Sequence, residues 1–499
     1  MTYAAGGSAL ASPTSGTANT GNGGNASSNN CNFRGGFGGS GVAIVRYQYT
    51  AGTNCTPFSV CARVGGPTTA TVYFTPPLNA ASLTITNYIA LSSPGGITST
   101  GSTSPILFSG LSGSTTYTFT VAAVTALGTG TYSSASLPIT TPVQPPTGPL
   151  FVMGNNSCGQ LGLNNSTSYS SPKQVGAATN WYSMAGGQYH SSAVDYSGKL
   201  WTWGGNTRGQ LGQNNTSVRS SPTQVGSLTN WKTVYNAPLD QVTVAIKNDN
   251  TLWTWGFNNN GQLGLGNTTY FSSPVQVGAL TNWLSVAAGR YFMGAIKTDG
   301  SLWTWGSNAL GYLGLNDSTN RSSPVQVGSL TNWKSVTAGN YHMAAIKTDG
   351  TLWTWGYYFA GVLGLNNGNS YSSPKQVGAL TNWSSVTAGA FHNIATKTDG
   401  TIWAWGRNTA GELGVGNTNY YSSPKQIGAR TNWTSNIIAG KQHNLAVDTS
   451  GKLWAWGLNT SGQLGNGAAT SLSSPVQIGS LTSWLTIAAG QYHSLIIHT

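Results

Sequence analysis

Charged residues are scarce in this sequence. Asp, Glu, Lys and Arg make up only 6% of the 499 residues, against roughly 25% in ordinary soluble proteins. Ser, Thr, Asn and Gly take their place, with 68 glycines in all. Solubility therefore depends on hydroxyl and amide groups, a composition that favours exposed β-structure, as on virions and cell surfaces, over helices.

Long apolar runs are missing as well. No stretch approaches the length of about 18 apolar residues that a transmembrane helix requires. The first residues, Met1–Leu10, also lack the basic start and apolar core of a signal peptide. We therefore expect no membrane insertion, and either an export route without a signal peptide or a natural start upstream of Met1.

Cysteine is too rare for a disulfide scaffold, with only Cys31, Cys55, Cys61 and Cys158 in the chain. One or two bridges near the start of the chain and free thiols in polar loops both agree with this number. Neither Cys nor His falls at the spacing of zinc ligands. We expect neither a metal nor another cofactor.

The net charge of +12 raises the question of nucleic-acid binding. Only Arg34, Arg46 and Arg63 precede residue 150, and the other basic residues are spread over the rest of the chain. Many of these recur at one repeated position: Lys247, Lys297, Lys347 and Lys397. Repetition distributes the charge around the molecule instead of gathering it in a stripe, so we expect no nucleic-acid partner.

Four regions follow one another along the chain. Residues 1–55 form an arm rich in Gly, Ser and Asn, which we expect to fix the protein in an assembly. Residues 56–142 alternate apolar and polar residues between Pro/Gly/Ser turns, a pattern typical of an immunoglobulin-like sandwich. Residues 143–149 form a stiff Pro-rich linker, and residues 150–499 are repetitive.

The repeats are marked by tryptophan. The motif W-x-W-G recurs every 50 to 52 residues and ends at Gly204, Gly256, Gly306, Gly356, Gly406 and Gly457. A divergent first copy is Leu150–Gly154, and all 19 tryptophans belong to the repeat. Each repeat has a Gly-rich loop, a polar loop ending in Ser-Ser-Pro, and strands read as V-Q-V-G, S-V-T-A-G, H-M-A-A-I-K and T-L-W-T-W-G. Short strands at this spacing predict an all-β fold, a seven-bladed β-propeller.

The ends of the repeat region predict how the ring closes. The chain stops in the strand 493–498, which no W-x-W-G strand follows, and the propeller begins with 150–154, which no strand precedes. Pairing 150–154 with 493–498 completes the seventh blade and removes two exposed sheet edges.

The motifs GxNxxGQLG, AAG-x-x-H and DGxLWxWG over residues 150–499 resemble the regulator of chromosome condensation family. That resemblance implies a seven-bladed propeller that binds proteins: a small GTPase and nucleosomes in the eukaryotic exchange factor, and a β-lactamase in bacterial inhibitors. Exchange activity in the family depends on an inserted wedge. The only extra residues here are two around Asn236–Gln241, so we do not expect exchange activity.

Two further resemblances concern the start of the chain. Residues 16–21 and 35–47 resemble the end of the glycine-rich modules of bacteriophage tail-fibre and tail-tip proteins. Residues 73–77, 85–89 and 111–121 resemble a fibronectin type III domain, with Tyr73 or Phe74 where that family usually has a core Trp. This domain is expected to act as a spacer.

No constellation of catalytic residues is present. His190, His342, His392, His443 and His493 share one repeat position, which favours a structural, hydrogen-bonded role. Asp240, Asp317 and Glu412 come from different repeats and form no pair at the spacing that acid–base catalysis requires. We predict that the protein is not an enzyme.

The candidate binding residues vary between repeats while staying aromatic or basic. One set lies at or next to the third position before the Ser-Ser-Pro proline: Tyr169, Arg219, Tyr270, Phe271, Arg321, Tyr371, Tyr420 and Tyr421. The other follows W-x-W-G: Phe257, Tyr357 and Arg407. Because they lie in polar loops, we expect them at one rim of the propeller; drift of exposed loops, or packing on the adjacent blade, is the alternative.

These observations favour a non-enzymatic virion protein, such as a phage tail fibre or tail-associated receptor-binding protein, oligomeric within its assembly. Its arm would contact other virion proteins, and its propeller would meet a host surface protein or glycan. A secreted propeller that binds or inhibits an enzyme, or a bacterial cell-surface adhesin, is the alternative.

Overall fold

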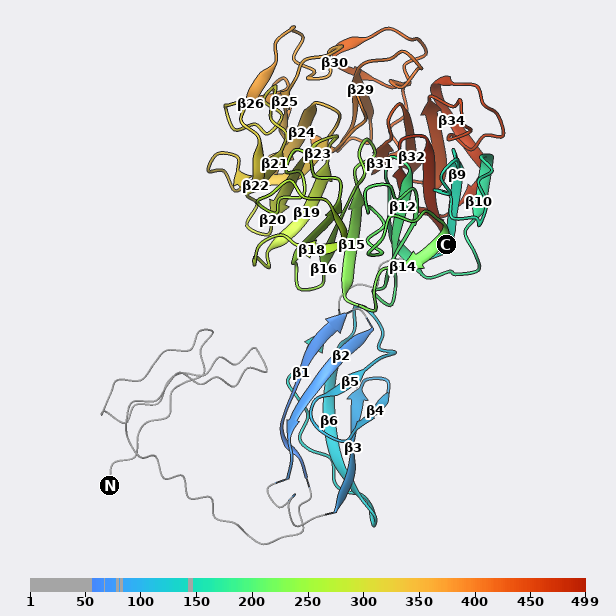
Figure 1. Cartoon of the computed structure of the whole chain (residues 1–499). Helices are drawn as coiled ribbons and strands as arrows, with labels where there is room; N and C mark the ends of the chain where they lie inside the picture. Colours follow the sequence, from blue (N-terminus) through green and yellow to red (C-terminus); the bar gives the residue numbers. More distant parts are fainter. Residues whose placement is uncertain (1–55, 67, 78–79, 81–83, 142–146) are drawn as a thin grey trace, which may run out of the picture. The chain divides into compact units, whose positions relative to one another are not determined.

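The computed structural model describes residues 56–66, 68–77, 80, 84–141 and 147–499, and its regular elements are β-strands (Figure 1). The arm 1–55, residue 142 of the expected sandwich and residues 143–146 of the expected linker lie outside the described residues, as do Cys31 and Cys55. The chain divides into two compact units, Met1–Pro145 and Pro146–Thr499.

The first unit contains two antiparallel sheets. One has the strand order β1-β2-β5; the other has the order β4-β3-β6-β7, with β8 paired to β6. Their bounds are β1 (Phe58–Gly66), β2 (Thr69–Thr75), β3 (Ile85–Ser93), β4 (Thr98–Gly101), β5 (Ile106–Phe108), β6 (Thr116–Thr125), β7 (Gly128–Thr129) and β8 (Ile139–Thr140).

One core joins these two sheets. Alternate residues of β2 and β6 are buried, as the period of two in a half-buried strand requires, and the ring centroids of Phe108 and Phe119 lie 4.8 Å apart. The Tyr117 hydroxyl accepts a hydrogen bond of 2.9 Å from the backbone N–H of Ser112. A tyrosine bonded back to the preceding chain in this way is typical of immunoglobulin-like sandwiches.

The second unit is a ring of seven four-stranded antiparallel sheets, which confirms the predicted seven-bladed propeller. We number each blade's strands outward from the axis, because the first strands of all seven blades line one central cavity of about 390 Å³. The first strands of blades 1 to 7 are β11 (Trp181–Gly186), β15 (Trp231–Asn236), β19 (Trp283–Ala288), β23 (Trp333–Ala338), β27 (Trp383–Ala388), β31 (Trp433–Ala439) and β35 (Trp484–Ala489). The second strands are β12 (His190–Asp195), β16 (Val242–Lys247), β20 (Phe292–Lys297), β24 (His342–Lys347), β28 (His392–Lys397), β32 (His443–Asp448) and β36 (His493–His498).

The two outer strands of each blade carry the W-x-W-G motif and the Ser-Ser-Pro motif. The third strands are β13 (Leu200–Gly204), β17 (Leu252–Gly256), β21 (Leu302–Gly306), β25 (Leu352–Gly356), β29 (Ile402–Gly406), β33 (Lys452–Gly457) and β9 (Leu150–Gly154). The fourth strands are β14 (Arg219–Gln224), β18 (Phe271–Gln276), β22 (Arg321–Gln326), β26 (Tyr371–Gln376), β30 (Tyr421–Gln426), β34 (Leu472–Thr482) and β10 (Tyr169–Gln174).

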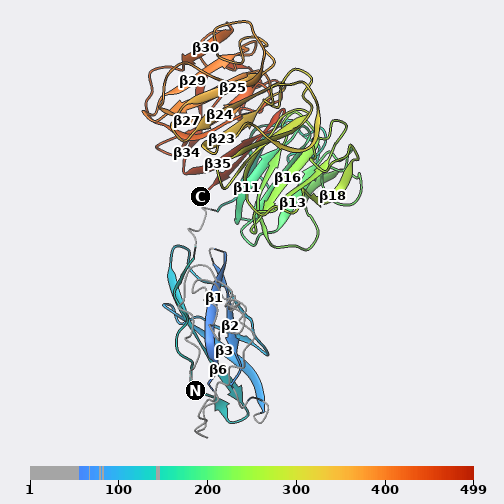
Figure 2. The ribbon, with the colours of Figure 1, turned by 90° about the vertical axis from the view of Figure 1, so that its left-hand side faces the viewer.

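Blade 7 is built from both ends of the propeller sequence. Strand β9 pairs with β36 in register, from His493 opposite Gly154 to Ile497 opposite Leu150. In Figure 2 the first strands β11 and β35, of blades 1 and 7, lie side by side. This pairing covers the open edges of β9 and β36, and the ring is thereby closed.

The outermost strands begin earlier than the sequence pattern predicts. We expected Ser-Ser-Pro in a loop and V-Q-V-G in the strand, but the strand of blade 3 starts at Arg321, which pairs with Gly306. A register shift between Thr304 and Gly306 accommodates the start of the strand. A proline is tolerated there because an edge strand does not need every backbone N–H for pairing.

Candidate functional site

The histidines that share a repeat position lie inside the ring, at the start of second strands. All five are buried, with exposed fractions of 0 to 1%. Each Nε2 lies 2.8 to 3.0 Å from a polar side chain of the next blade. The pairs are His190–Thr243, His342–Asn393, His392–Asn444, His443–Ser494 and His493–Ser191.

The hydrogen bonds around Asn393 show which ring nitrogen of His342 carries the proton. Asn393 Nδ2 donates to the backbone oxygen of Val362 at 2.8 Å, so its Oδ1 faces His342 and accepts the Nε2–H at 3.0 Å. Burial lowers the pKa of His342 to about 4 and that of His493 to about 3. The imidazoles are therefore neutral near pH 7 and join the blades, which agrees with the structural role expected from the sequence.

The glycine of the A-A-G segment makes room for each of these rings. A Cβ at Gly339 would lie 2.3 Å from Cε1 of His342, far below any real contact. The recurrence of Gly and His three residues apart thus has a packing cause.

The three carboxylates that we considered for catalysis lie in different blades, and each has its own structural partners. Glu412 is fully buried, replaces the repeat glutamine and accepts from the backbone N–H of Ala410 at 2.6 Å. Asp240 accepts from Gln262 Nε2 at 3.1 Å, and burial raises its pKa to about 7. Asp317 pairs with Arg321 at 2.6 Å. No group of three or more His, Cys, Asp or Glu side chains able to hold a metal occurs among the described residues.

The first set of predicted binding residues begins the fourth strands instead of lying in loops. Tyr169, Arg219, Phe271, Arg321, Tyr371 and Tyr421 each pair with the glycine that ends W-x-W-G in their blade. All six are half-buried. Tyr270 and Tyr420 directly precede this position, and Tyr420 is exposed. We call the six half-buried positions the outer rim.

Two tyrosines of the outer rim are hydrogen-bonded to residues of the loops that precede them. Asn367 Nδ2 donates to the Tyr371 hydroxyl at 3.2 Å, and Asn417 Nδ2 donates to that of Tyr421 at 3.1 Å. Phe271 packs against the cores on both sides of its blade. Packing therefore accounts for much of the aromatic character at this rim.

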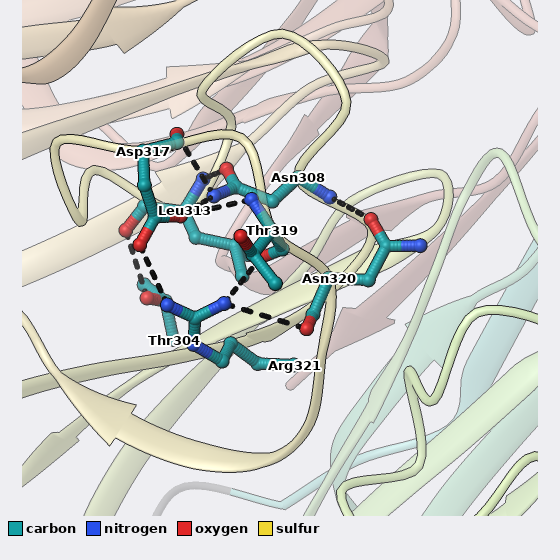
Figure 3. A network of polar contacts seen from close by, with 7 residues as sticks. All are labelled: Thr304, Asn308, Leu313, Asp317, Thr319, Asn320 and Arg321. Atoms are coloured by element: carbon teal, nitrogen blue, oxygen red, sulfur yellow. Dashed lines mark hydrogen bonds and ion pairs between the residues drawn. The ribbon is translucent and has the colours of Figure 1, made fainter.

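Figure 3 shows how the loop of blade 3 is locked around one arginine. The Arg321 guanidinium donates to Asp317 Oδ2 at 2.6 Å and to the backbone oxygen of Thr319 at 2.8 Å. Asn308 Nδ2 donates to Asp317 Oδ1 at 2.8 Å, while Leu313 N donates to Asn308 Oδ1 at 2.9 Å. The Thr319 N–H bond and the neighbouring arginine lower the pKa of Asp317, so this pair stays ionised and holds the loop.

The second set of predicted residues lies on one end of the propeller, which we call the loop face. It consists of the loops between first and second strands and between third and fourth strands, which emerge at the same strand ends of an antiparallel blade. Phe257, Tyr357 and Arg407 belong to it, each directly after a third strand.

An aromatic row crosses the loop face over blades 2 to 5. Its members are Tyr270, Phe257, Tyr291, Tyr341, Phe391 and Phe359. Four consecutive pairs are in contact, three of them with centroid distances of 5.1 Å for Phe257–Tyr270, 6.2 Å for Phe257–Tyr291 and 4.7 Å for Phe359–Phe391. Tyr341 and Phe391 lie 6.0 Å apart. The rings are half-buried, and Phe359 is 40% exposed.

Cationic side chains lie among these rings. The Arg290 guanidinium lies 4.9 Å from the Tyr291 ring and donates to the Tyr341 hydroxyl at 2.8 Å. Arg208 lies 5.3 Å from the Tyr270 ring, and Arg407 lies 5.1 Å from Phe391. Of these three, only Arg407 forms a direct ion pair in the described part of the chain, with Glu412 at 3.2 Å, while the charge of Arg290 acts on the buried Asp240 without a direct contact.

Our sequence reasoning missed Tyr291, Tyr341 and Phe391. The signal was present, because the residue before the histidine position is aromatic in five of seven copies: Tyr189, Tyr291, Tyr341, Phe391 and Tyr492. The remaining two copies have Gln241 and Gln442. Only the blade topology brings this position next to the loop that follows W-x-W-G.

In the described residues, no helix is both long and apolar enough to span a membrane.

Cys158 is a half-buried free thiol in the loop between β9 and β10 of blade 7.

Comparisons with known proteins agree with this architecture. The model of the Regulator of chromosome condensation (RCC1) repeat matches residues 147–194, 197–236, 249–296, 299–346, 349–396, 399–447 and 450–497. The Protein RCC2 homolog of Danio rerio is 42% identical over 57 residues, which span 11% of this chain and 12% of that protein.

Two solved propellers share the fold. Prp20p from Saccharomyces cerevisiae has a TM-score of 0.63 at 20% identity, with 71% of this chain and 92% of that chain covered. Human WBSCR16 has a TM-score of 0.63 at 19% identity, with 70% and 99% covered. Since the seven matched repeats cover more than half of the sequence, this protein belongs to the regulator of chromosome condensation (RCC1) repeat family.

Proposed function

We propose that this protein is a non-enzymatic binding protein whose propeller holds a partner through the loop face. The observation that carries the proposal is the aromatic row with its interleaved arginines. Positions that serve packing alone stay alike from blade to blade, as the buried tryptophans do. The aromatic row instead varies between copies and combines rings with Arg290 and Arg208, which form no direct ion pair among the described residues. Exposed Tyr, Phe and Arg are the usual anchors of interfaces.

The carboxylates support a role without catalysis. Asp317 and Glu412 are ion-paired within their own loops, and Asp240 is buried against Gln262. No two of them are linked by a hydrogen bond in the described residues. General acid–base catalysis requires groups within hydrogen-bond reach of one reacting centre.

The finer proposal is a virion appendage protein, such as a tail fibre or tail-associated receptor-binding protein. Scarce charge, the glycine-rich start and a β-sandwich before the propeller support it. A secreted protein that captures an enzyme, or a cell-surface adhesin, would use the same face. Prp20p, which shares the fold, is described by its binding to Gsp1p and histones, so such a propeller is compatible with protein partners.

Two measurements test these proposals in turn. Immunogold microscopy and mass spectrometry of particles purified from the producing culture should find the chain in the particle; its absence there would contradict the virion proposal. Fluorescently labelled full-length protein is then titrated onto host cells.

Two sets of substitutions separate the loop face from the outer rim. Arg290→Ala with Phe359→Ala should weaken binding by at least about tenfold with an unchanged melting temperature, because the anchors are partly exposed. The matched control is Arg321→Ala with Tyr371→Ala and Tyr421→Ala, at the outer rim. Loss with the control alone would assign binding to the outer rim, and undiminished binding by both variants would refute a binding role for either surface.

A further inference from the structure

The propeller has a repeated groove between adjacent blades, near the strand ends opposite the aromatic row. The chain between a fourth strand and the next first strand forms one wall, and part of the loop between third and fourth strands forms another. Equivalent grooves are found at four junctions, with volumes of about 580, 360, 320 and 390 Å³. Each is lined by the tryptophan that begins a first strand: Trp181, Trp433, Trp283 and Trp383. The groove before blade 1 is the largest of them.

In blades 2 to 5, a lysine of the blade itself covers the indole of the first tryptophan in W-x-W-G. The lysine Nζ lies 3.4 to 3.7 Å from the centroid of that ring. The pairs are Lys247–Trp253, Lys297–Trp303, Lys347–Trp353 and Lys397–Trp403. An ammonium group is attracted to the face of an indole, so this position is a cation site that the chain itself occupies.

Blades 1 and 6 have aspartate in place of this lysine. Asp195 Oδ2 accepts from Trp201 Nε1 at 2.9 Å, and Asp448 Oδ2 accepts from Trp454 Nε1 at 3.0 Å. Blade 6 replaces the missing cation with Arg430, whose guanidinium carbon lies 4.2 Å from the Trp454 centroid.

Blade 1 has no such replacement. The residue equivalent to Arg430 is Ala178, and among the described residues no cation lies over Trp201. Trp201, Trp181 and Asp195 all line the enlarged groove, and Asp195 is the only charged residue of its lining. The groove therefore combines an indole that no cation covers with a carboxylate that accepts hydrogen bonds from Ser197, Lys199 and Trp201 but has no ion-pair partner among the described residues.

We propose that the groove formed by Trp181, Trp201, Asp195 and Ala178 binds a lysine side chain of a partner molecule. The ligand's ammonium group would take the place that lysine Nζ holds in four sister blades, over the indole and beside the carboxylate. A primary ammonium fits better than a quaternary one, because its N–H groups donate to Asp195 while its slender chain passes Ala178. This site is distinct from the loop face and does not depend on the function proposed for it.

The test is titration of the full-length protein with Nα-acetyl-lysine methylamide, followed by saturation-transfer NMR. We expect millimolar binding, about the range that a single desolvated cation contact supports. The Nε-acetylated probe has nearly the same shape but no charge, and it should not bind. Choline is the comparison for a quaternary ammonium group; tighter binding of choline than of the lysine probe would overturn the assignment to lysine.

Sister blades supply the variants. Ala178→Arg introduces the arginine of blade 6, and Asp195→Lys introduces the lysine of blades 2 to 5. Each should fill the groove from within and weaken probe binding by at least about tenfold. Leu280→Ala is the control, since it widens the groove of blade 3 while Lys297 still covers Trp303.

The reciprocal change should create a site. Arg430→Ala removes the guanidinium over Trp454 and keeps Asp448, so the probe stoichiometry should rise from one to two. Melting temperatures confirm that each variant is folded. Absence of binding by the wild type at about 10 mM probe, or undiminished binding by both Ala178→Arg and Asp195→Lys, would overturn the proposal.

Discussion

Five of the seven blade junctions are joined through a histidine, and two are joined through apolar side chains. Where the second strand begins with histidine, the next blade presents Thr, Asn or Ser at 2.8 to 3.0 Å. Where it begins with Val242 or Phe292, the next blade presents Met293 or Met343 in the same buried cluster.

No junction combines a histidine with an apolar partner, or an apolar residue with a polar partner. The two positions across a junction must therefore match in polarity, whichever residues occupy them. A buried polar group without a partner costs more than a hydrogen bond contributes, which penalises any mixed junction. The comparison also explains why the histidines recur without forming an active site.

The largest effect is expected from breaking the junction that closes the ring. Deletion of residues 150–154 removes Leu150, Val152 and Met153, which are fully buried, and leaves β36 paired only with β35. The loss of these three side chains alone costs about 5–9 kcal/mol. Thermal unfolding should show a much lower melting temperature, whereas deletion of five residues within 1–55 should leave it unchanged. An unchanged melting temperature for the first deletion would contradict closure by β9.

An intermediate effect is expected from mixing the chemistries at one junction. His342→Phe leaves Asn393 Oδ1 buried without a donor, at a cost of about 1–3 kcal/mol. Adding Asn393→Met recreates the pair of Phe292 and Met343, and the Val362 oxygen keeps its bond from Trp405 Nε1 at 2.9 Å.

Urea unfolding measures the coupling between these two substitutions. The double variant should be more stable than His342→Phe alone by about 1 kcal/mol or more. Simple additivity of the two single changes would show that the junction does not require matching.

An effect of similar size is expected in the pH dependence of the same variants. Burial lowers the pKa of His342 to about 4, while His392 nearby lowers it further and the bond to Asn393 raises it. A lowered pKa in the folded state means that unfolding takes up protons below the unfolded value of about 6.5. Its contribution to stability is thus present above pH 6.5 and is lost as the pH falls toward 4.

The variant His342→Phe with Asn393→Met should lose less stability between pH 7 and pH 5 than the wild type does. The expected difference is about 2 kcal/mol for one histidine. Unfolding curves at the two pH values measure it, and parallel losses in both proteins would mean that His342 is not buried in its neutral form.

The outer rim shows where prediction from the pattern reached its limit. Variable aromatic and basic residues at equivalent positions indicated an interface, but Tyr371 and Tyr421 are bonded by Asn367 and Asn417 of their own loops. The loop face was predicted through Phe257, Tyr357 and Arg407, and Tyr270 of the first set also belongs to its aromatic row. Its members Tyr291, Tyr341, Phe391 and Phe359 were not predicted. Tyr291 contacts Phe257 although it lies 34 residues further along the chain.

The sequence by itself determined the number of blades, because a tryptophan-bearing unit that cannot bury its own faces must stack against its neighbours. It also determined which two segments had to meet, since each was a strand lacking its partner. Only the tertiary structure decided which side chains of successive copies touch: His493 with Ser191, 302 residues apart, or Arg430 over Trp454 where blade 1 has only Ala178. Contacts between equivalent positions depend on the offset between neighbouring blades, and that offset is set by packing across the junction, which the repeat pattern of one chain does not encode.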